Sequence, residues 1–146
     1  MRHQFDLPSD YSQFEVTCKI AIFNPDRTSL LLATYDDGLY GLPGGHLEPH
    51  ESPDAAARRE LAEELALTPT HPLHPVTFGF HPEKQKVILL FATTLADDTP
   101  LPPAPPNSEH LTGSRWVALA DIRADQKNLY LDAHYRQLLF SIEEKS

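Results

Sequence analysis

Three glutamates in one short segment have the residue type and spacing to hold a divalent metal ion. Glu60, Glu63 and Glu64 stand at positions i, i+3 and i+4, so in a helix they would share one face. Carboxylates this close repel one another unless a cation lies among them, and Mg²⁺ prefers carboxylate, carbonyl and water oxygens. The spacing predicts a metal site. The alternative is a solvated acidic face, because such runs are common on surface helices.

The residues before and between these glutamates predict the helix that would carry them. Ser52 can cap a helix N-terminus, and the fixed φ of Pro53 suits the first helical position. Ala57, Leu61 and Leu65 then recur every four positions, which predicts a narrow apolar stripe for packing. We therefore expect a helix that begins after Ser52 and places the acidic face away from its apolar stripe.

Two adjacent glycines and a loop precede this helix and favour the metal-site interpretation. Gly44 and Gly45 allow unusual backbone dihedrals and a close approach to a ligand. Glu51 stands eight residues before Arg59, so a salt bridge between them could brace the loop against the helix.

The segment resembles the sequence box of the Nudix hydrolase family, Gly-x5-Glu-x7-Arg-Glu-U-x-Glu-Glu-x-Gly-U, where U is aliphatic. The matching positions are filled without a gap by Gly45, Glu51, Arg59, Glu60, Leu61, Glu63, Glu64 and Leu67. Two positions depart: Ala66 replaces the last glycine of the box, and His50 replaces a glycine often found before the loop glutamate. A left-handed Ala66 would cost about 1 kcal/mol, and neither change removes an oxygen ligand.

The resemblance implies a fold, a reaction and a set of roles. The fold would be an α/β/α sandwich with a mixed sheet between helices, and the reaction would be Mg²⁺-dependent hydrolysis of a diphosphate linkage, with Mn²⁺ as an alternative ion. The implied metal ligands are the carbonyl of Gly44 and the side chains of Glu60, Glu63 and Glu64. In some members the glutamate at the position of Glu60 is also proposed as the base. Gly45, Glu51 and Arg59 would support the site.

A further catalytic group is expected from a loop nearer the C-terminus. Many members of the family place the general base, or another metal ligand, just before a strand that contains tryptophan. Here Glu109 precedes the segment around Trp116, with a solvated loop glutamate as the alternative and His110 as a substitute. We expect Trp116 itself to pack in the core rather than to stack on a nucleotide base.

The substrate is less sharply defined than the reaction. Residues 42–48 are similar to the MutT-like part of the family and favour a nucleoside triphosphate, which would release pyrophosphate and a nucleoside monophosphate. The alternatives are ADP-ribose, a dinucleoside polyphosphate or a non-nucleotide diphosphate. A nucleotide-binding module without catalysis is the alternative from another class, although such modules typically lose glutamates that this chain retains.

Composition bounds the remaining possibilities. The 146 residues are 40% hydrophobic and 23% charged, typical of a soluble globular protein and most simply a single domain, residues 1–146. The net charge of −9 argues against a nucleic acid as partner, and a phosphate substrate would need metal ions to approach. With no signal peptide or membrane-length apolar run, we expect a cytoplasmic monomer or homodimer. Cys18 is expected to be a buried thiol, and the histidine spacing does not predict a zinc site.

Alternation and turn residues give a coarse order of elements. Strands are expected at residues 14–23, 29–35, 76–80, 86–95 and 115–119, the first two forming a hairpin across a turn at 24–27. A terminal helix is expected at residues 132–144, and the proline-rich residues 100–106 are expected to form a stiffened loop rather than a docking segment.

Overall fold

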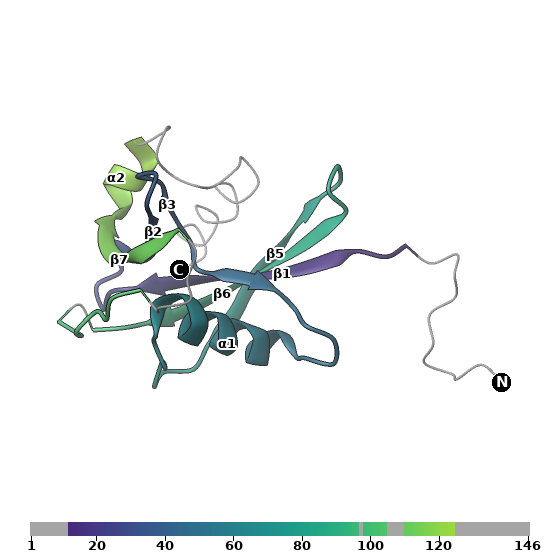
Figure 1. The fold of residues 1–146 in the computed structure, drawn as a ribbon, viewed down its shortest axis with the longest axis horizontal. Helices are drawn as coiled ribbons and strands as arrows, with labels where there is room; N and C mark the ends of the chain where they lie inside the picture. Colours follow the sequence, from purple (N-terminus) through teal and green to yellow (C-terminus); the bar gives the residue numbers. More distant parts are fainter. Residues whose placement is uncertain (1–11, 97, 105–109, 125–146) are drawn as a thin grey trace.

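The computed structural model describes residues 12–96, 98–104 and 110–124, which contain one mixed sheet and two helices (Figure 1). Within these residues the sheet has seven strands in the order β3-β2-β1-β6-β5, with β4 paired to β1 and β7 paired to β2. The elements are β1 Glu15–Phe23, β2 Ser29–Tyr35, β3 Tyr40–Gly41, β4 Gly44–His46, α1 Pro53–Leu65, β5 His74–His81, β6 Lys86–Thr94, β7 Leu111–Ala118 and α2 Leu119–Ala124. The predicted α/β class with a mixed sheet is confirmed.

The central strand β1 positions the two adjacent glycines that precede α1. Along one side it pairs in parallel with the whole of β6, and on the other side its first half pairs with β4 and its end with β2. Gly44 and Gly45, for which no strand was predicted, are therefore strand residues in register with Lys19 and Cys18. The predicted pairing of residues 14–23 with 29–35 is confirmed, since Phe23 lies opposite Leu30.

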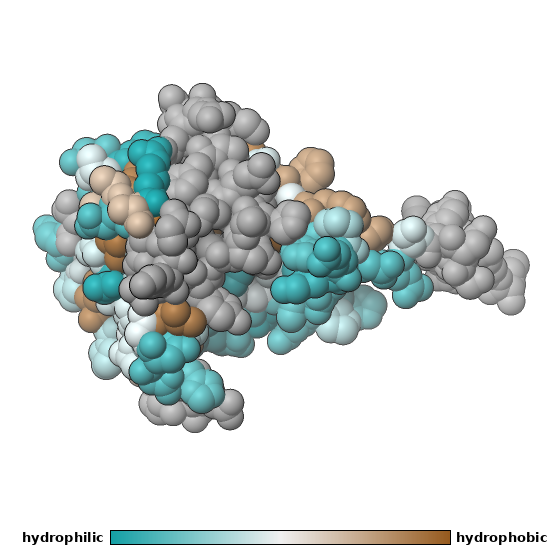
Figure 2. Space-filling view, turned by 90° about the horizontal axis from the view of Figure 1, so that it is seen from above, coloured by the Kyte–Doolittle hydropathy of each residue, from teal (hydrophilic) through white to brown (hydrophobic). Residues whose placement is uncertain are grey.

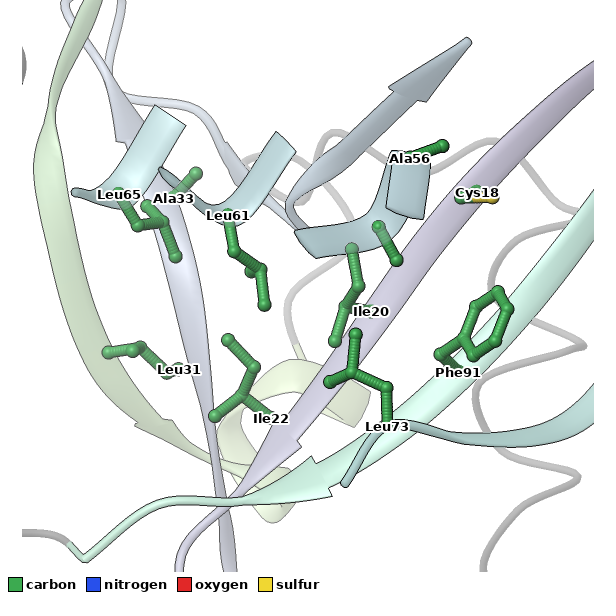
Figure 3. Packing of buried hydrophobic residues seen from close by; sticks show 11 residues of the cluster. Cys18, Ile20, Ile22, Leu31, Ala33, Ala56, Leu61, Leu65, Leu73 and Phe91 are labelled. Carbon is green, nitrogen blue, oxygen red and sulfur yellow. The ribbon is translucent and has the colours of Figure 1, made fainter. Parts of the chain in front are cut away.

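Alternate residues of β1 supply two cores, one on each face of the sheet. Cys18, Ile20 and Ile22 pack beneath α1 (Figure 3), together with the predicted apolar stripe of Ala57, Leu61 and Leu65. Ala21 and Phe23 point to the opposite face, in the cluster that also contains Leu119 and Ile122 of α2. Each face is covered by a helix, as the predicted sandwich requires.

Both ends of α1 follow the predicted chemistry. Oγ of Ser52 accepts a hydrogen bond from the amide of Ala55 at 3.1 Å, and Pro53 is the first helical residue. At the other end Ala66 has φ +53, and its amide donates to the carbonyl of Ala62. The left-handed conformation that a glycine usually takes is therefore held here by alanine.

Two elements, β5 and β7, differ from their predicted bounds by more than one residue. β5 begins at His74 rather than at residue 76 and contains Pro75; it is an edge strand, which can tolerate a missing amide donor, and its register shifts between Pro75 and Thr77. β7 begins at Leu111, and Leu119, predicted to end that strand, instead begins α2. Residues 100–104 have no regular structure; residues 105–106 and the predicted helix at 132–144 lie outside the described residues.

The described surface, of which Figure 2 shows one face, carries on that face hydrophilic residues beside small hydrophobic groups. Its exposed large hydrophobic residues are Phe14, Phe78 and Phe80, and the rings of Phe14 and Phe80 meet edge to face at 5.3 Å between centroids. Neither α1 nor α2 is long and apolar enough to cross a membrane.

Candidate active site

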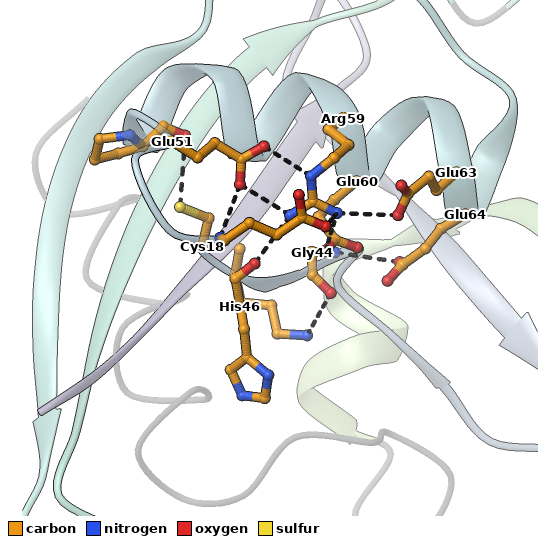
Figure 4. Close-up of polar contacts among 11 residues, drawn as sticks. Cys18, Gly44, His46, Glu51, Arg59, Glu60, Glu63 and Glu64 are labelled. Carbon is orange, nitrogen blue, oxygen red and sulfur yellow. Dashed lines mark hydrogen bonds and ion pairs between the residues drawn. The ribbon is translucent and has the colours of Figure 1, made fainter.

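Arg59 joins α1 to the loop that precedes it (Figure 4). Its Nε donates to one carboxylate oxygen of Glu51 at 2.7 Å and its Nη2 donates to the other at 3.0 Å. The same Nη2 donates to the carbonyl of His46 at 3.0 Å, at the end of β4. This bidentate pairing holds the pKa of Glu51 below its usual range. The contact between Glu51 and Arg59 that the sequence predicted is therefore present.

The remaining nitrogen of Arg59 draws two further carboxylates toward the loop. Nη1 donates to Oε1 of Glu60 and to Oε2 of Glu63, each at 3.0 Å. Glu63 is exposed, whereas Glu60 is 9% exposed. One guanidinium therefore fixes the loop acid, the buried acid and the exposed acid of the helix in one network.

Gly45 makes room for the buried carboxylate. A Cβ atom at Gly45 would lie 2.5 Å from Oε1 of Glu60, so any side chain at this position would displace that carboxylate. Gly44 has φ +138, and a Cβ atom there would collide with the backbone carbonyl of Cys18. Both adjacent glycines are thus required by close approach, Gly45 to the carboxylate of Glu60 and Gly44 to the neighbouring strand.

Glu64 completes the acidic group from the next turn of the helix. Its Oε2 accepts a hydrogen bond from the amide of Gly44 at 3.2 Å. The pKa of Glu64 is raised to about 7, chiefly by burial and in part by the neighbouring Glu60, against the opposing effects of Lys19 and of the Gly44 amide. The pair of Glu60 and Glu64 therefore carries an unfavourable concentration of negative charge.

Lys19 is a residue of this site that the sequence analysis missed. Its Nζ lies 3.4 Å from the carbonyl oxygen of Gly44 and 3.5 Å from that of Leu42, and it donates to both. Burial lowers the pKa of Lys19, and the charges of Glu64 and Glu60 oppose that effect. A signal was present, since Lys19 is the only charged residue from position 16 to position 23.

The donor chemistry of this group fits a hard divalent cation. Glu64 accepts from the amide of Gly44, Glu60 occupies the space left by the missing Cβ of Gly45, and the carbonyl of Gly44 is an oxygen of the same strand. Glu63 is turned to Arg59 (Figure 4). In the part of the chain that the structure describes, no three His, Cys, Asp or Glu side chains are already grouped as a metal site.

The second predicted catalytic segment is described only in part. Glu109 lies outside the described residues. His110, its possible substitute, has φ +68, and its Nδ1 lies 3.1 Å from Oδ2 of Asp36. Trp116 is partly buried and packs against the core beneath α1, which confirms the predicted packing role.

Cys18 is buried as predicted, below the start of α1. Its Sγ lies 3.6 Å from the carbonyl of Pro53, and burial, with the charges of Glu51 and Glu60, raises the pKa of its thiol to about 11. A thiol in this state is a poor nucleophile.

Comparison with known proteins gives one family. The model of the NUDIX domain matches residues 14–139. Solved structures with a similar fold include the MutT protein from Methanosarcina mazei Go1, with a TM-score of 0.66, 21% identity and coverage of 90% of this chain and 94% of that one. They also include the NUDIX domain of Shewanella oneidensis NrtR complexed with ADP ribose, with a TM-score of 0.66, 21% identity and coverage of 98% and 95%.

A third similar structure is an ADP-ribose pyrophosphatase from Streptococcus suis 89-1591, with a TM-score of 0.64, 23% identity and coverage of 91% of this chain and 92% of that one. No curated protein sequence matches the chain. At these identities the structural likeness establishes the fold.

Proposed function

The chain belongs to the Nudix family of hydrolases, and from this premise we propose that it hydrolyses a diphosphate linkage in a nucleotide with the help of Mg²⁺. The proposed substrate is a nucleoside triphosphate, cleaved to a nucleoside monophosphate and pyrophosphate. The observation that carries the proposal is the meeting of Glu60 and Glu64 at the paired glycines of β4.

This arrangement answers the physical problem of the reaction. A polyphosphate is densely anionic and the chain has a net charge of −9, so the two repel each other without a cation between them. Bound Mg²⁺ supplies neutralisation of phosphate oxygens and acidification of water. In our proposal Glu60, Glu63, Glu64 and the carbonyl of Gly44 hold that ion.

The other residues of the network have positioning roles in this proposal. Arg59 holds Glu51 by two hydrogen bonds, so the loop ahead of α1 keeps its place while the acids of the helix bind the ion. Glu109 is proposed as the general base, to be tested as Glu109→Gln: turnover should fall while Mn²⁺ binding is retained.

The experiment measures phosphate release from a panel of substrates, with a coupled pyrophosphatase for nucleoside triphosphates and a coupled alkaline phosphatase for substrates whose cleavage yields phosphomonoesters and no pyrophosphate. The panel holds nucleoside triphosphates, oxidised purines included, together with ADP-ribose and dinucleoside polyphosphates, each with Mg²⁺ and with EDTA. ADP-ribose belongs in the panel because it is bound in the Shewanella structure. Turnover of triphosphates with Mg²⁺ and silence with EDTA is the expected result; turnover of ADP-ribose alone would move the assignment to that substrate.

A matched pair of variants ties the activity to the site. Glu64→Gln keeps the shape of the side chain and removes its charge, so it should abolish turnover while the protein stays folded. Glu83→Gln removes the same charge from an exposed position in the turn between β5 and β6 and should leave turnover unchanged. Full activity in Glu64→Gln would refute the site assignment.

The same panel separates catalysis from binding. A nucleotide-binding module would bind nucleotide with the substrate intact, detectable by calorimetry, and would show no turnover with any divalent ion. We favour the enzyme because Glu51, Glu60, Glu63 and Glu64 are all present.

A further inference from the structure

A lysine lies where the proposed metal ion would meet the backbone. Lys19 projects from the middle of β1 toward the face of the sheet opposite to α1, because its neighbours Cys18 and Ile20 pack beneath α1. From there its ammonium donates to the carbonyls of Gly44 and Leu42, at 3.4 and 3.5 Å.

The register of the sheet fixes the backbone of Lys19 beside Gly44. Lys19 lies opposite Gly44 in the antiparallel pair of β1 and β4, and opposite Leu90 in the parallel pair of β1 and β6. A strand paired on both sides has little freedom to move its backbone, so the stem of Lys19 starts from a fixed point beside Gly44. Only the flexible side chain can carry the ammonium away from the carbonyl.

The ammonium of Lys19 and a divalent ion would be attracted by the same negative groups, two carboxylates and one carbonyl oxygen. Glu64 and Glu60 both act on Lys19, and the same two carboxylates with the Gly44 carbonyl form the proposed ion site. A monovalent and a divalent cation a few ångströms apart repel each other strongly when partly shielded from water. Lys19 also satisfies an oxygen that the metal would otherwise take.

We propose that Lys19 is an exchangeable internal cation, which binds the Gly44 carbonyl in the metal-free protein and must leave it when a divalent ion binds. This inference rests on the proposed function, because it assumes that Gly44 and the glutamates of α1 hold the ion. In this role the charge of Lys19 offsets those of Glu60 and Glu64 between catalytic cycles, and it lowers the affinity of the metal-free protein for the ion. It is a positioning residue that acts through the ion.

The test measures direct binding of Mn²⁺ in the absence of substrate. Binding is detected as the loss of the free-ion signal in electron paramagnetic resonance. Lys19→Met keeps the length and the apolar stem of the side chain and removes its charge. Lys84→Met removes the same charge from the exposed turn between β5 and β6 and is the control for net charge. Lys19→Arg retains the charge and tests rescue.

We expect Lys19→Met to bind Mn²⁺ about tenfold more tightly than the natural sequence, while Lys84→Met and Lys19→Arg bind as the natural sequence does. Circular dichroism and thermal unfolding in EDTA show that each variant is folded. A merely structural role for Lys19 would weaken binding or leave it unchanged.

Two results would overturn the inference, and they are distinguishable. If the natural sequence binds Mn²⁺ and folded Lys19→Met binds it equally or more weakly, the exchange is wrong while the proposed metal site stands. If neither protein binds Mn²⁺, the proposed metal-dependent function and the exchange fail together.

Discussion

The raised pKa of Glu64 predicts that this carboxylate destabilises the metal-free protein at neutral and alkaline pH. Its pKa is about 7 in the folded protein and ordinarily 4.5, so the folded state binds more protons between these two values. Stability must then fall as the pH rises through that interval. The penalty is absent below about pH 4.5 and complete above about pH 7.

The magnitude follows from the same two values. A tenfold change in an acidity constant is worth about 1.4 kcal/mol, so the rise from 4.5 to about 7 corresponds to about 3 kcal/mol. Glu64→Gln removes the titration and retains an oxygen that can accept from the amide of Gly44. Its free energy of unfolding should therefore rise relative to the natural sequence by up to about 3 kcal/mol between about pH 4.5 and about pH 8.

The assay is urea denaturation in EDTA across this pH range, followed by the fluorescence of Trp116, the single tryptophan, which is partly buried. The difference in the free energy of unfolding between the variant and the natural sequence cancels the contributions of groups that titrate in both proteins. Glu83→Gln, in the exposed turn, should give a flat difference. A flat difference for Glu64→Gln, or a fall with rising pH, would refute the reasoning: Lys19 and the Gly44 amide, not burial, would then control this carboxylate.

Three further predictions concern single residues of the same region. Ala66→Gly should raise the free energy of unfolding by about 1 kcal/mol, measured in urea, because Ala66 has φ +53 and glycine avoids the Cβ clash; no gain would contradict this. Gly45→Ala should lower turnover by about a hundredfold in a folded protein, since its Cβ would lie 2.5 Å from Oε1 of Glu60; unchanged kinetics would show that the cradle is unimportant. Cys18, with its thiol pKa raised to about 11 by burial, should react with a thiol reagent at about pH 8 only after unfolding, and rapid labelling of the native protein would contradict its burial.

The parts of the fold that the sequence predicted are those with local determinants. The bounds of α1 follow from Ser52, Pro53 and the residues after Leu65, all within one turn of the helix ends. β4 was missed because Gly44–His46 has no strand propensity of its own. Its extended form comes from pairing with residues of β1 about 25 positions away, and a contact of that kind cannot be deduced from neighbouring residues.

The candidate site divides in the same way. The spacing from Glu51 to Arg59 was sufficient to predict their contact, because both belong to one loop-helix unit. The arrival of Lys19 at the Gly44 carbonyl depends on the register between β1 and β4. A lone lysine in an apolar strand marks a special position, but the sequence could not say which backbone or side-chain groups surround it.

The charges of the site are distributed unevenly between the acids near Arg59 and Glu64 near Gly44. The described part of the site contains two cations, Lys19 and Arg59, and five carboxylates, those of Glu48, Glu51, Glu60, Glu63 and Glu64. Arg59 contacts four of these acids, all but Glu64.

The uncompensated charge therefore gathers beside Gly44, where burial has already driven the pKa of Glu64 to about 7. The ammonium of Lys19 partly offsets the negative charge of Glu60 and Glu64, and its flexible side chain allows it to move away. The acidic network thus has a fixed end at Arg59, which holds the loop against the helix, and in our proposal an exchangeable end at Lys19, where a divalent ion would bind.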